Sequence, residues 1–230
     1  MEETKDTRTR IIESFSSNRC PLCAMLQRDE FDSLCRWVGL SSESAKDSEQ
    51  RKQLLTAGGF CNYHFWRFQQ MSTHYGIAGI AVQLIEKLLQ ILRMHKQKYF
   101  ADAIKYKGTR SKIWLSDNDV KCPLCRELDE KERVYLKELL AVLRHNEHRS
   151  RYEKSCGLCM PHLMKVIDYF EDVSLLKFLF ETEIDQLEKT KADAANFVSK
   201  RYPPLRWGQT NNEKKSWFRA IEKIVGRSGA

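Results

Sequence analysis

Two Cys-Pro-Leu-Cys motifs, Cys20–Cys23 and Cys122–Cys125, constrain the fold of this 230-residue chain more than any other feature. Superposing the motifs without gaps matches further residues along the chain: Leu26 with Leu128, Glu30 with Glu132, and Leu34 with Leu136. An internal repeat indicates that one structural unit is used more than once. The sequence therefore predicts a duplicated protein.

A second pair of matching motifs follows the first in each copy. Gly59-Phe60-Cys61 superposes on Gly157-Leu158-Cys159, and this superposition places His64 on His162. The second and third cysteines are 38 positions apart in one copy and 34 in the other. A difference of this size is typical of a loop that changes length between copies.

These cysteines and histidines have the spacing of metal ligands. A Cys-x-x-Cys turn brings two sulfurs together, and a Cys and a His three residues apart share one helix face. Each copy is expected to complete its own Cys3His set, a common structural zinc site without a vacant position. The alternative is cysteines packed in the core. The sequence thus predicts two zinc ions, one held by Cys20, Cys23, Cys61 and His64, the other by Cys122, Cys125, Cys159 and His162.

Four further residues are candidates that the repeat does not select. Cys156 forms a second Cys-x-x-Cys with Cys159, but its counterpart is Gly58, so we expect it not to be a ligand. Cys35 corresponds to Lys137 and is expected to be a buried thiol on an apolar helix. His145 and His148 lie in a polar stretch that is more typical of a solvated helix end than of a metal site.

Glycine (10) and proline (5) are scarce, which favours helices. The expected fold is all-α, with three helices in each copy and a C-terminal helix. The copies span 11–107 and 122–203, joined by a linker at 108–121, and the basic C-terminal helix lies within 204–230 and docks on the body. Whether the copies share one core stays open.

The apolar spacing places the helices within each copy. The first helix begins at the Cys-x-x-Cys turn, and the second begins near the third cysteine. The third is long, from Ile77 to about Ile104 and from Ser174 to about Lys200, and a loop is expected over 41–50. After a capping box at Thr210 and Glu213, the last helix carries an apolar face expected to pack on the body, formed by Trp217, Phe218, Ile221, Ile224 and Val225. Binding a partner is the alternative role of that helix.

No uninterrupted run of about 18 apolar residues is present, so we expect no membrane span. The charged segment Met1–Arg10 lacks the apolar core of a secretory signal. We therefore expect a cytoplasmic protein, where paired cysteines are more typical of metal or redox sites than of disulfides.

The net charge of +8 is unevenly distributed. Segment 91–112 has seven Lys or Arg residues against one Asp, and segment 200–230 has eight against two acidic residues. Basic surfaces attract nucleic acid or acidic proteins, although a solvated helix face and a basic tail explain the same pattern.

No catalytic motif accompanies the metal ligands, so we assign no catalytic residue. The leading hypothesis is a non-enzymatic zinc protein that binds an acidic macromolecule, either nucleic acid or protein. The alternative is an iron–sulfur redox or sensor protein with the same ligands. Thiol–disulfide exchange is less favoured, because no strand is expected before either Cys-x-x-Cys motif.

The repeated Cys-Pro-Leu-Cys and Gly-(Phe/Leu)-Cys-x-x-His motifs resemble those of an uncharacterised bacterial and archaeal family of helical proteins of unknown function. The resemblance covers about Asn18 to Tyr202. It implies the same set of ligands and a bacterial or archaeal origin, and it implies no reaction.

Overall fold

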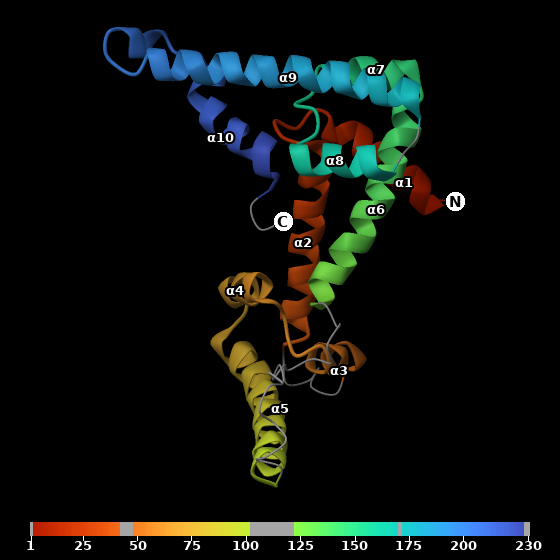
Figure 1. Cartoon of the computed structure of the whole chain (residues 1–230), viewed down its shortest axis with the longest axis vertical. Helices are drawn as coiled ribbons and strands as arrows, with labels where there is room; N and C mark the ends of the chain where they lie inside the picture. Colours follow the sequence, from red (N-terminus) through yellow and green to blue (C-terminus); the bar gives the residue numbers. More distant parts are fainter. Residues whose placement is uncertain (1, 42–47, 102–121, 170–171, 228–230) are drawn as a thin grey trace. The chain divides into compact units, whose positions relative to one another are not determined.

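The fold was analysed in a computed structural model, which describes residues 2–41, 48–101, 122–169 and 172–227 (Figure 1). Over these ranges the chain forms ten α-helices, α1 to α10, together with one short 3-10 helix, and no β-strand. The prediction of an all-α fold is confirmed. The predicted linker, 108–121, lies outside the described residues.

The chain divides into two compact units. Unit 1 comprises Met1–Arg28 and Glu130–Ala230, and unit 2 comprises Asp29–Asp129. Helices α2 (Pro21–Gly39) and α6 (Pro123–Leu143) each begin in one unit and continue into the other. The compact units therefore differ from the two sequence copies, because each unit takes the start of one Cys-Pro-Leu-Cys helix and the remainder of the other.

Unit 2 is built around the helices that follow α2. These are α3 (Glu49–Thr56), α4 (Asn62–Met71) and α5 (His74–Ala101). Phe60 lies at the centre of their core, with its ring 5.3 Å from Trp37 and 5.4 Å from Phe68, centroid to centroid. The buried side chains of this core are Leu34, Leu54, Phe60, Phe68, Ile80, Leu84, Cys122 and Leu124.

Unit 1 contains α1 (Glu2–Ser14), α7 (Asn146–Glu153), α8 (Met160–Tyr169), α9 (Val173–Ser199) and α10 (Asn211–Val225). Helix α1 was not predicted, because most of its residues are charged or polar and few apolar residues mark its buried side. Ile11 is completely buried, Phe15 packs edge-on against Tyr152 at 5.4 Å, and Arg8 pairs with Glu138 at 2.6 Å. These contacts hold the N-terminal helix in unit 1.

The same order of helices follows each Cys-Pro-Leu-Cys motif, with nearly equal lengths. Helices α2 to α5 have 19, 8, 10 and 28 residues, and helices α6 to α9 have 21, 8, 10 and 27. The prediction of three helices per copy was wrong, since the short helices α3 and α7 are additional. Each is too short and too polar to show an apolar stripe. Helix α3 buries Arg51 and Leu54, and α7 buries Tyr152, which matches Leu54 in the superposed copies.

A buried polar cluster fixes the centre of unit 1. Glu183 of α9 accepts hydrogen bonds from the Tyr152 hydroxyl at 2.5 Å, the Leu158 N–H at 2.6 Å and the Lys223 ammonium at 2.7 Å. Lys223 also donates to the Leu158 carbonyl at 2.8 Å. A Cβ on Gly157, whose φ is +65°, would lie 2.5 Å from the Glu183 carboxylate. Glycine is therefore required at 157 both for its backbone conformation and for this close approach.

Helix α10 packs on α9 and α8 through its polar side. Its buried side chains are Glu213, Ser216 and Lys223, and Arg219 reaches Asp193 of α9 at 2.6 Å. The predicted capping box between Thr210 and Glu213 is present. The expectation that the apolar face packs inward was wrong, since that face is exposed: Trp217, Phe218, Ile221, Ile224 and Val225.

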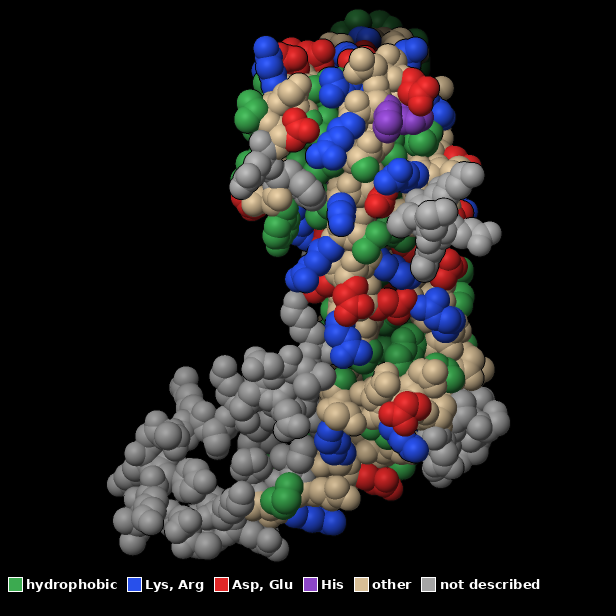
Figure 2. All heavy atoms as spheres, turned by 90° about the vertical axis from the view of Figure 1, so that its right-hand side faces the viewer, with side chains coloured by type: hydrophobic (Ala, Val, Ile, Leu, Met, Phe, Trp, Pro, Cys, Tyr) green, Lys and Arg blue, Asp and Glu red, His purple; other side chains and the backbone are tan. Residues whose placement is uncertain are grey.

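Charges of both signs are mixed over the surface shown in Figure 2, where Lys and Arg side chains alternate with Asp and Glu. Most of the basic segment predicted at 91–112 falls outside the described side chains. Within the basic segment after 200, three cations are engaged in ion pairs: Lys200 with Glu213, Arg219 with Asp193, and Lys223 with Glu183.

One stretch of α5, His74–Met94, is long and apolar enough on average to cross a membrane, and 18% of its most apolar window is buried. The sequence predicts no span, because it contains no uninterrupted apolar run of about 18 residues. Glu86 and Lys87 do interrupt this stretch, and charged side chains are costly at the centre of a bilayer.

Replacing Glu183 with Gln should destabilise unit 1 strongly. The change leaves the Lys223 charge buried without its counterion, which typically costs about 3–5 kcal/mol. Urea unfolding followed by circular dichroism measures the loss.

The matched control is Glu181→Gln, also on α9. Glu181 is exposed and lies 3.9 Å from exposed Lys177, so its loss should change the free energy of unfolding by less than about 0.5 kcal/mol. If both changes lowered the free energy of unfolding equally, the buried cluster would contribute no more stability than an exposed ion pair.

Candidate metal centres

All eight predicted ligands gather into two four-residue clusters. Cluster A consists of Cys20, Cys23, Cys159 and His162, and cluster B consists of Cys61, His64, Cys122 and Cys125. In each cluster the four ligand atoms lie within 4.8 Å of one another. All of cluster A is buried, as are His64 and Cys122 of cluster B, whereas Cys61 and Cys125 are half-buried. Both clusters are candidate sites for a metal ion.

The predicted pairing of ligands within each copy was wrong. Cys20 and Cys23 meet the Cys-x-x-His pair of the second copy, and Cys122 and Cys125 meet that of the first. The reason is the length of α2 and α6. Each begins in one unit and continues into the other, so a Cys-Pro-Leu-Cys turn is in a different unit from the Cys-x-x-His of its own copy.

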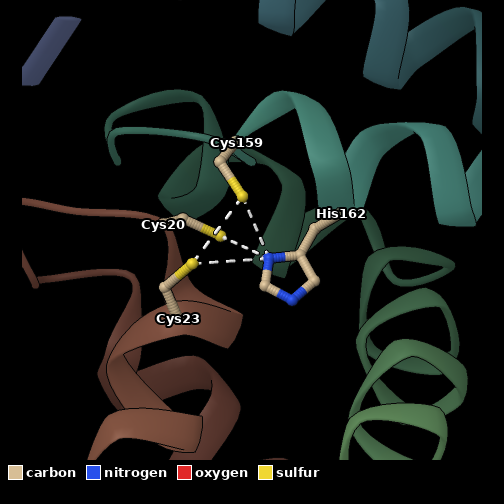
Figure 3. A group of neighbouring side chains, drawn as sticks. All are labelled: Cys20, Cys23, Cys159 and His162. Carbon is tan, nitrogen blue, oxygen red and sulfur yellow. Dashed lines mark hydrogen bonds between the residues drawn. The ribbon is translucent and has the colours of Figure 1, made fainter. Parts of the chain in front are cut away.

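The four side chains of cluster A point toward a common centre (Figure 3). The His162 Nδ1 atom lies 3.4, 3.5 and 3.0 Å from the sulfurs of Cys20, Cys23 and Cys159, and the sulfurs of Cys23 and Cys159 are 3.7 Å apart. Tetrahedral zinc, with bonds of about 2.3 Å to sulfur and 2.0–2.1 Å to nitrogen, separates its ligands by roughly 3.8 Å (S–S) and 3.5 Å (S–N). The arrangement therefore fits one tetrahedral ion.

Cluster B has the same geometry. The His64 Nδ1 atom lies 3.3, 3.6 and 3.4 Å from the sulfurs of Cys61, Cys122 and Cys125. The sulfurs of Cys61 and Cys125 are 3.7 Å apart. Both histidines thus present Nδ1 to the sulfurs and direct Nε2 away from them.

Every ligand belongs to the first turn of a helix. Pro21 and Pro123 occupy the first positions of α2 and α6, where proline lacks only an N–H that would be unbonded. Cys61 caps α4 with an extended backbone, and its carbonyl accepts from the Phe65 N–H at 2.9 Å. Cys159 accepts from the Leu163 N–H in the same way. The partial positive charge of these helix starts favours thiolates and therefore metal binding.

The protonation of the cysteines is uneven. In cluster A, hydrogen bonds with Cys20 and Cys23 lower the pKa of Cys159 to about 4, while the bond with Cys159 raises the pKa of Cys23 far above its usual range. In cluster B, the bond with Cys125 lowers the pKa of Cys122 to about 3, and the pKa of Cys125 is raised. One sulfur of each pair carries the charge, and its neighbour keeps a proton that a divalent cation would displace.

A carboxylate lies behind each histidine, and sequence reasoning did not assign it a role. Glu132 is 2.9 Å from Nε2 of His162 and 2.6 Å from Lys165, and Glu30 is 3.7 Å from Nε2 of His64 and 3.9 Å from Arg67. The signal was in the repeat, since Glu30 superposes on Glu132. A carboxylate that is hydrogen-bonded to the outer nitrogen fixes the ring orientation and tautomer of a metal-binding histidine, and Glu132 is placed to do so for His162.

Electrostatics around cluster A agrees with this role of Glu132. Burial raises the pKa of Glu132, but hydrogen bonds with His162 and Lys165 outweigh burial and lower it to about 2. Burial likewise lowers the pKa of His162, but hydrogen bonds with Cys20 and Glu132 raise it to about 9. Glu132 therefore stays ionised and accepts from the Nε2–H, which leaves Nδ1 as the atom that faces the sulfurs.

The remaining candidates lie outside both clusters. Cys156 is half-buried, and burial raises the pKa of its thiol. Cys35 is exposed, so the prediction of a buried thiol was wrong; it lies on the solvent side of α2. His145 caps α7, with its ring 6.1 Å from that of His148.

The pairing can be tested with two quadruple variants of matched size. Removing cluster A by Cys20→Ser, Cys23→Ser, Cys159→Ser and His162→Ala should leave one metal per chain, measured by elemental analysis. Removing the first copy's ligands instead, by Cys20→Ser, Cys23→Ser, Cys61→Ser and His64→Ala, should leave none, because each cluster then loses half of its ligands. If instead the cluster A variant held no metal and the first-copy variant held one, the ligands would pair within copies.

Replacing Glu132 with Gln should weaken zinc binding at cluster A by about 10- to 100-fold, because His162 loses its charged acceptor. Competition with a chromophoric chelator measures this affinity. Glu130→Gln, an exposed change two residues away on α6, should leave it unchanged. An unaltered affinity in the Glu132 variant would contradict the assigned role.

Comparison with known proteins places the chain in a family but does not supply an activity. Neither the comparison with curated proteins nor that with solved structures found a match. A model of a family of unknown function matches residues 5–230, which include both clusters, most of α1 and all of α10. The chain therefore belongs to this family, DUF6062, whose function is unknown.

Proposed function

We propose that this protein binds two zinc ions, one in each Cys3His cluster, and acts as a non-enzymatic interaction module. The observation that carries the proposal is the tetrahedral spacing of four donors in both clusters, with sulfur pairs 3.7 Å apart. Four protein ligands complete the coordination of zinc, whereas catalytic zinc sites keep a position for water or substrate. The role proposed for the ions is therefore structural.

A zinc ion would join segments that are distant in sequence. In cluster A it would connect the start of α2 to the start of α8, since Cys20 and His162 are 142 positions apart. In cluster B it would connect the start of α6 to the start of α4, with 61 positions between Cys125 and His64. Zinc contributes about 10–16 kcal/mol of apparent binding free energy in small zinc modules, which is large against ordinary folding stability.

Iron–sulfur chemistry is the alternative, because the same ligand types can hold iron. The donor spacing favours zinc. A cluster of several irons places an inorganic core between its protein ligands, so its cysteine sulfurs would lie farther apart than sulfurs that share one ion. The iron–sulfur alternative thus requires the cysteine sulfurs of both clusters to move farther apart.

The proposed partner is an acidic macromolecule. Support comes from the net charge of +8 and from four exposed cations near the C-terminus that have room to meet a partner: Arg201, Arg206, Lys214 and Lys215. Binding through such contacts would weaken as salt increases.

Protein purified without oxygen should be colourless and contain about two zinc ions per chain. Removing the metal with a chelator should lower both the helical circular dichroism and the melting temperature, because each ion ties two helix starts together. Elemental analysis, an absorption spectrum and a thermal melt provide the three measurements.

A brown preparation containing iron and sulfide would favour the alternative. An unchanged melt after verified metal removal would contradict the structural role. The variant that lacks all of cluster A provides the control, since it should show about half the metal content and a partial loss of stability.

A further inference from the structure

The exposed side of α10 is an apolar strip on an otherwise polar helix. Trp217, Phe218, Ile221, Ile224 and Val225 are 44–65% exposed. Successive residues of an α-helix are rotated by about 100°, so these five fall within roughly one third of the helix circumference. The segment before α10 adds further exposed apolar side chains: Tyr202, Leu205 and Trp207.

Ion pairs prevent this strip from turning inward. The opposite side of α10 is attached to α9 and to the loop before α8 through Arg219–Asp193, Lys223–Glu183 and the hydrogen bond from Lys223 to the Leu158 carbonyl. Rotating the helix would separate the buried Lys223–Glu183 pair and the half-buried Arg219–Asp193 pair. The apolar strip is therefore presented outward by the fold itself.

The exposed charged side chains of segment 201–225 are all basic. The acidic residues of the segment, Glu213 and Glu222, are engaged with Lys200 and Arg19 at 2.8 and 3.2 Å. Lys214 and Lys215 lie at the exposed start of α10, and Arg201 and Arg206 precede it. The surface thus combines tryptophans, aliphatic side chains and exposed cations.

We propose that this surface, formed by 201–207 and the outer side of α10, binds the surface of an anionic lipid bilayer. Interfacial helices of this kind bury an apolar side among acyl chains while Lys and Arg meet anionic headgroups, and tryptophan favours the interface itself. The inference goes beyond the interaction role proposed above, because it assigns the same exposed cations to anionic lipid instead of an acidic macromolecule. It requires unit 1 to be folded but not a particular metal.

Other partners fit the surface less well. A second copy would bring the same cations together, which disfavours association. Nucleic acid would use the cations and stack on tryptophan, but Ile221, Ile224 and Val225 offer it neither charge nor an aromatic ring. A groove on an acidic protein would match both the apolar strip and the exposed cations, and the experiment below distinguishes such a protein from lipid.

The test is flotation of the purified full-length protein with vesicles. Binding is expected to vesicles of phosphatidylcholine mixed with phosphatidylserine, with little binding to phosphatidylcholine alone, and it should weaken as salt rises. Ile221→Ser should reduce binding about tenfold, because it removes apolar area from the strip. Lys214→Glu together with Lys215→Glu should remove the preference for phosphatidylserine.

The matched control is Ile184→Ser on α9. Ile184 is 54% exposed and Ile221 51%, both in unit 1, so the two variants make the same chemical change at equal exposure. Only the change at Ile221 should affect flotation. Unchanged circular dichroism in both variants verifies that the fold is intact.

Several results would overturn the proposal. Absence of flotation with anionic vesicles would do so, and so would binding that survives both the Ile221 and the Lys214/Lys215 changes. Binding to a short DNA duplex that depends on Lys214 and Lys215 but not on Ile221, without flotation, would identify a nucleic-acid surface. A dimer in sedimentation that dissociates on Ile221→Ser would identify a second copy. Binding to an acidic protein that depends on both Ile221 and Lys214/Lys215, without flotation, would identify a protein groove.

Metal content measured in the same preparations keeps the two proposals apart. Chains that float but contain no zinc would contradict the metal assignment alone. Chains with two zinc ions that do not float would contradict the lipid assignment alone.

Discussion

Each cluster joins the first turn of one long helix to the first turn of a short helix that comes from the other half of the sequence. Much of the architecture depends on this exchange. It requires α2 and α6 to continue from one compact unit into the other, and it gives each unit ligands from both copies. The four first turns also present their positive ends to the sulfurs, so the backbone that positions the ligands also favours their ionised form.

The repeat in the sequence was sufficient to identify all eight residues of the clusters, because two copies of the same spacing select six of eight cysteines and add two histidines. It was insufficient to pair them. Intervals of 38 and 34 residues are long enough to allow a contact within a copy or between copies. The pairing depends on where α2 and α6 run after their first turns, and apolar periodicity does not contain that information. Glu30 and Glu132 were visible as a matched pair, but their role required the position of the histidine rings.

The errors on α3, α7 and α10 have related physical causes. A helix of eight residues whose one buried apolar or aromatic side chain is Leu54 or Tyr152 has no apolar stripe to read. In α10 the apolar stripe was identified correctly, but polar contacts decide which side of the helix is buried. Lys223 points inward because it pairs with Glu183. When the two copies are superposed, Glu183 aligns with Ile85, so the repeat did not indicate a buried charge at this position. A buried ion pair contributes little to the free energy of folding compared with a well-packed apolar pair of the same size. Removing one of its partners is nevertheless costly, because the other charge stays buried alone. The carboxylates of Glu183 and Asp193 on α9 therefore help to decide which side of α10 faces water.

The crossed arrangement of ligands also sets an order of events during synthesis. Cluster B is complete once Cys125 has been made, whereas Cys20 and Cys23 must wait for His162, 142 positions after Cys20. At about 5–20 residues per second, the ribosome takes roughly 7–28 s to cover that distance. Throughout this interval the first two thiols of the chain lack the two residues that complete their cluster in the folded protein. The earliest ligands in the sequence are thus the last to be enclosed.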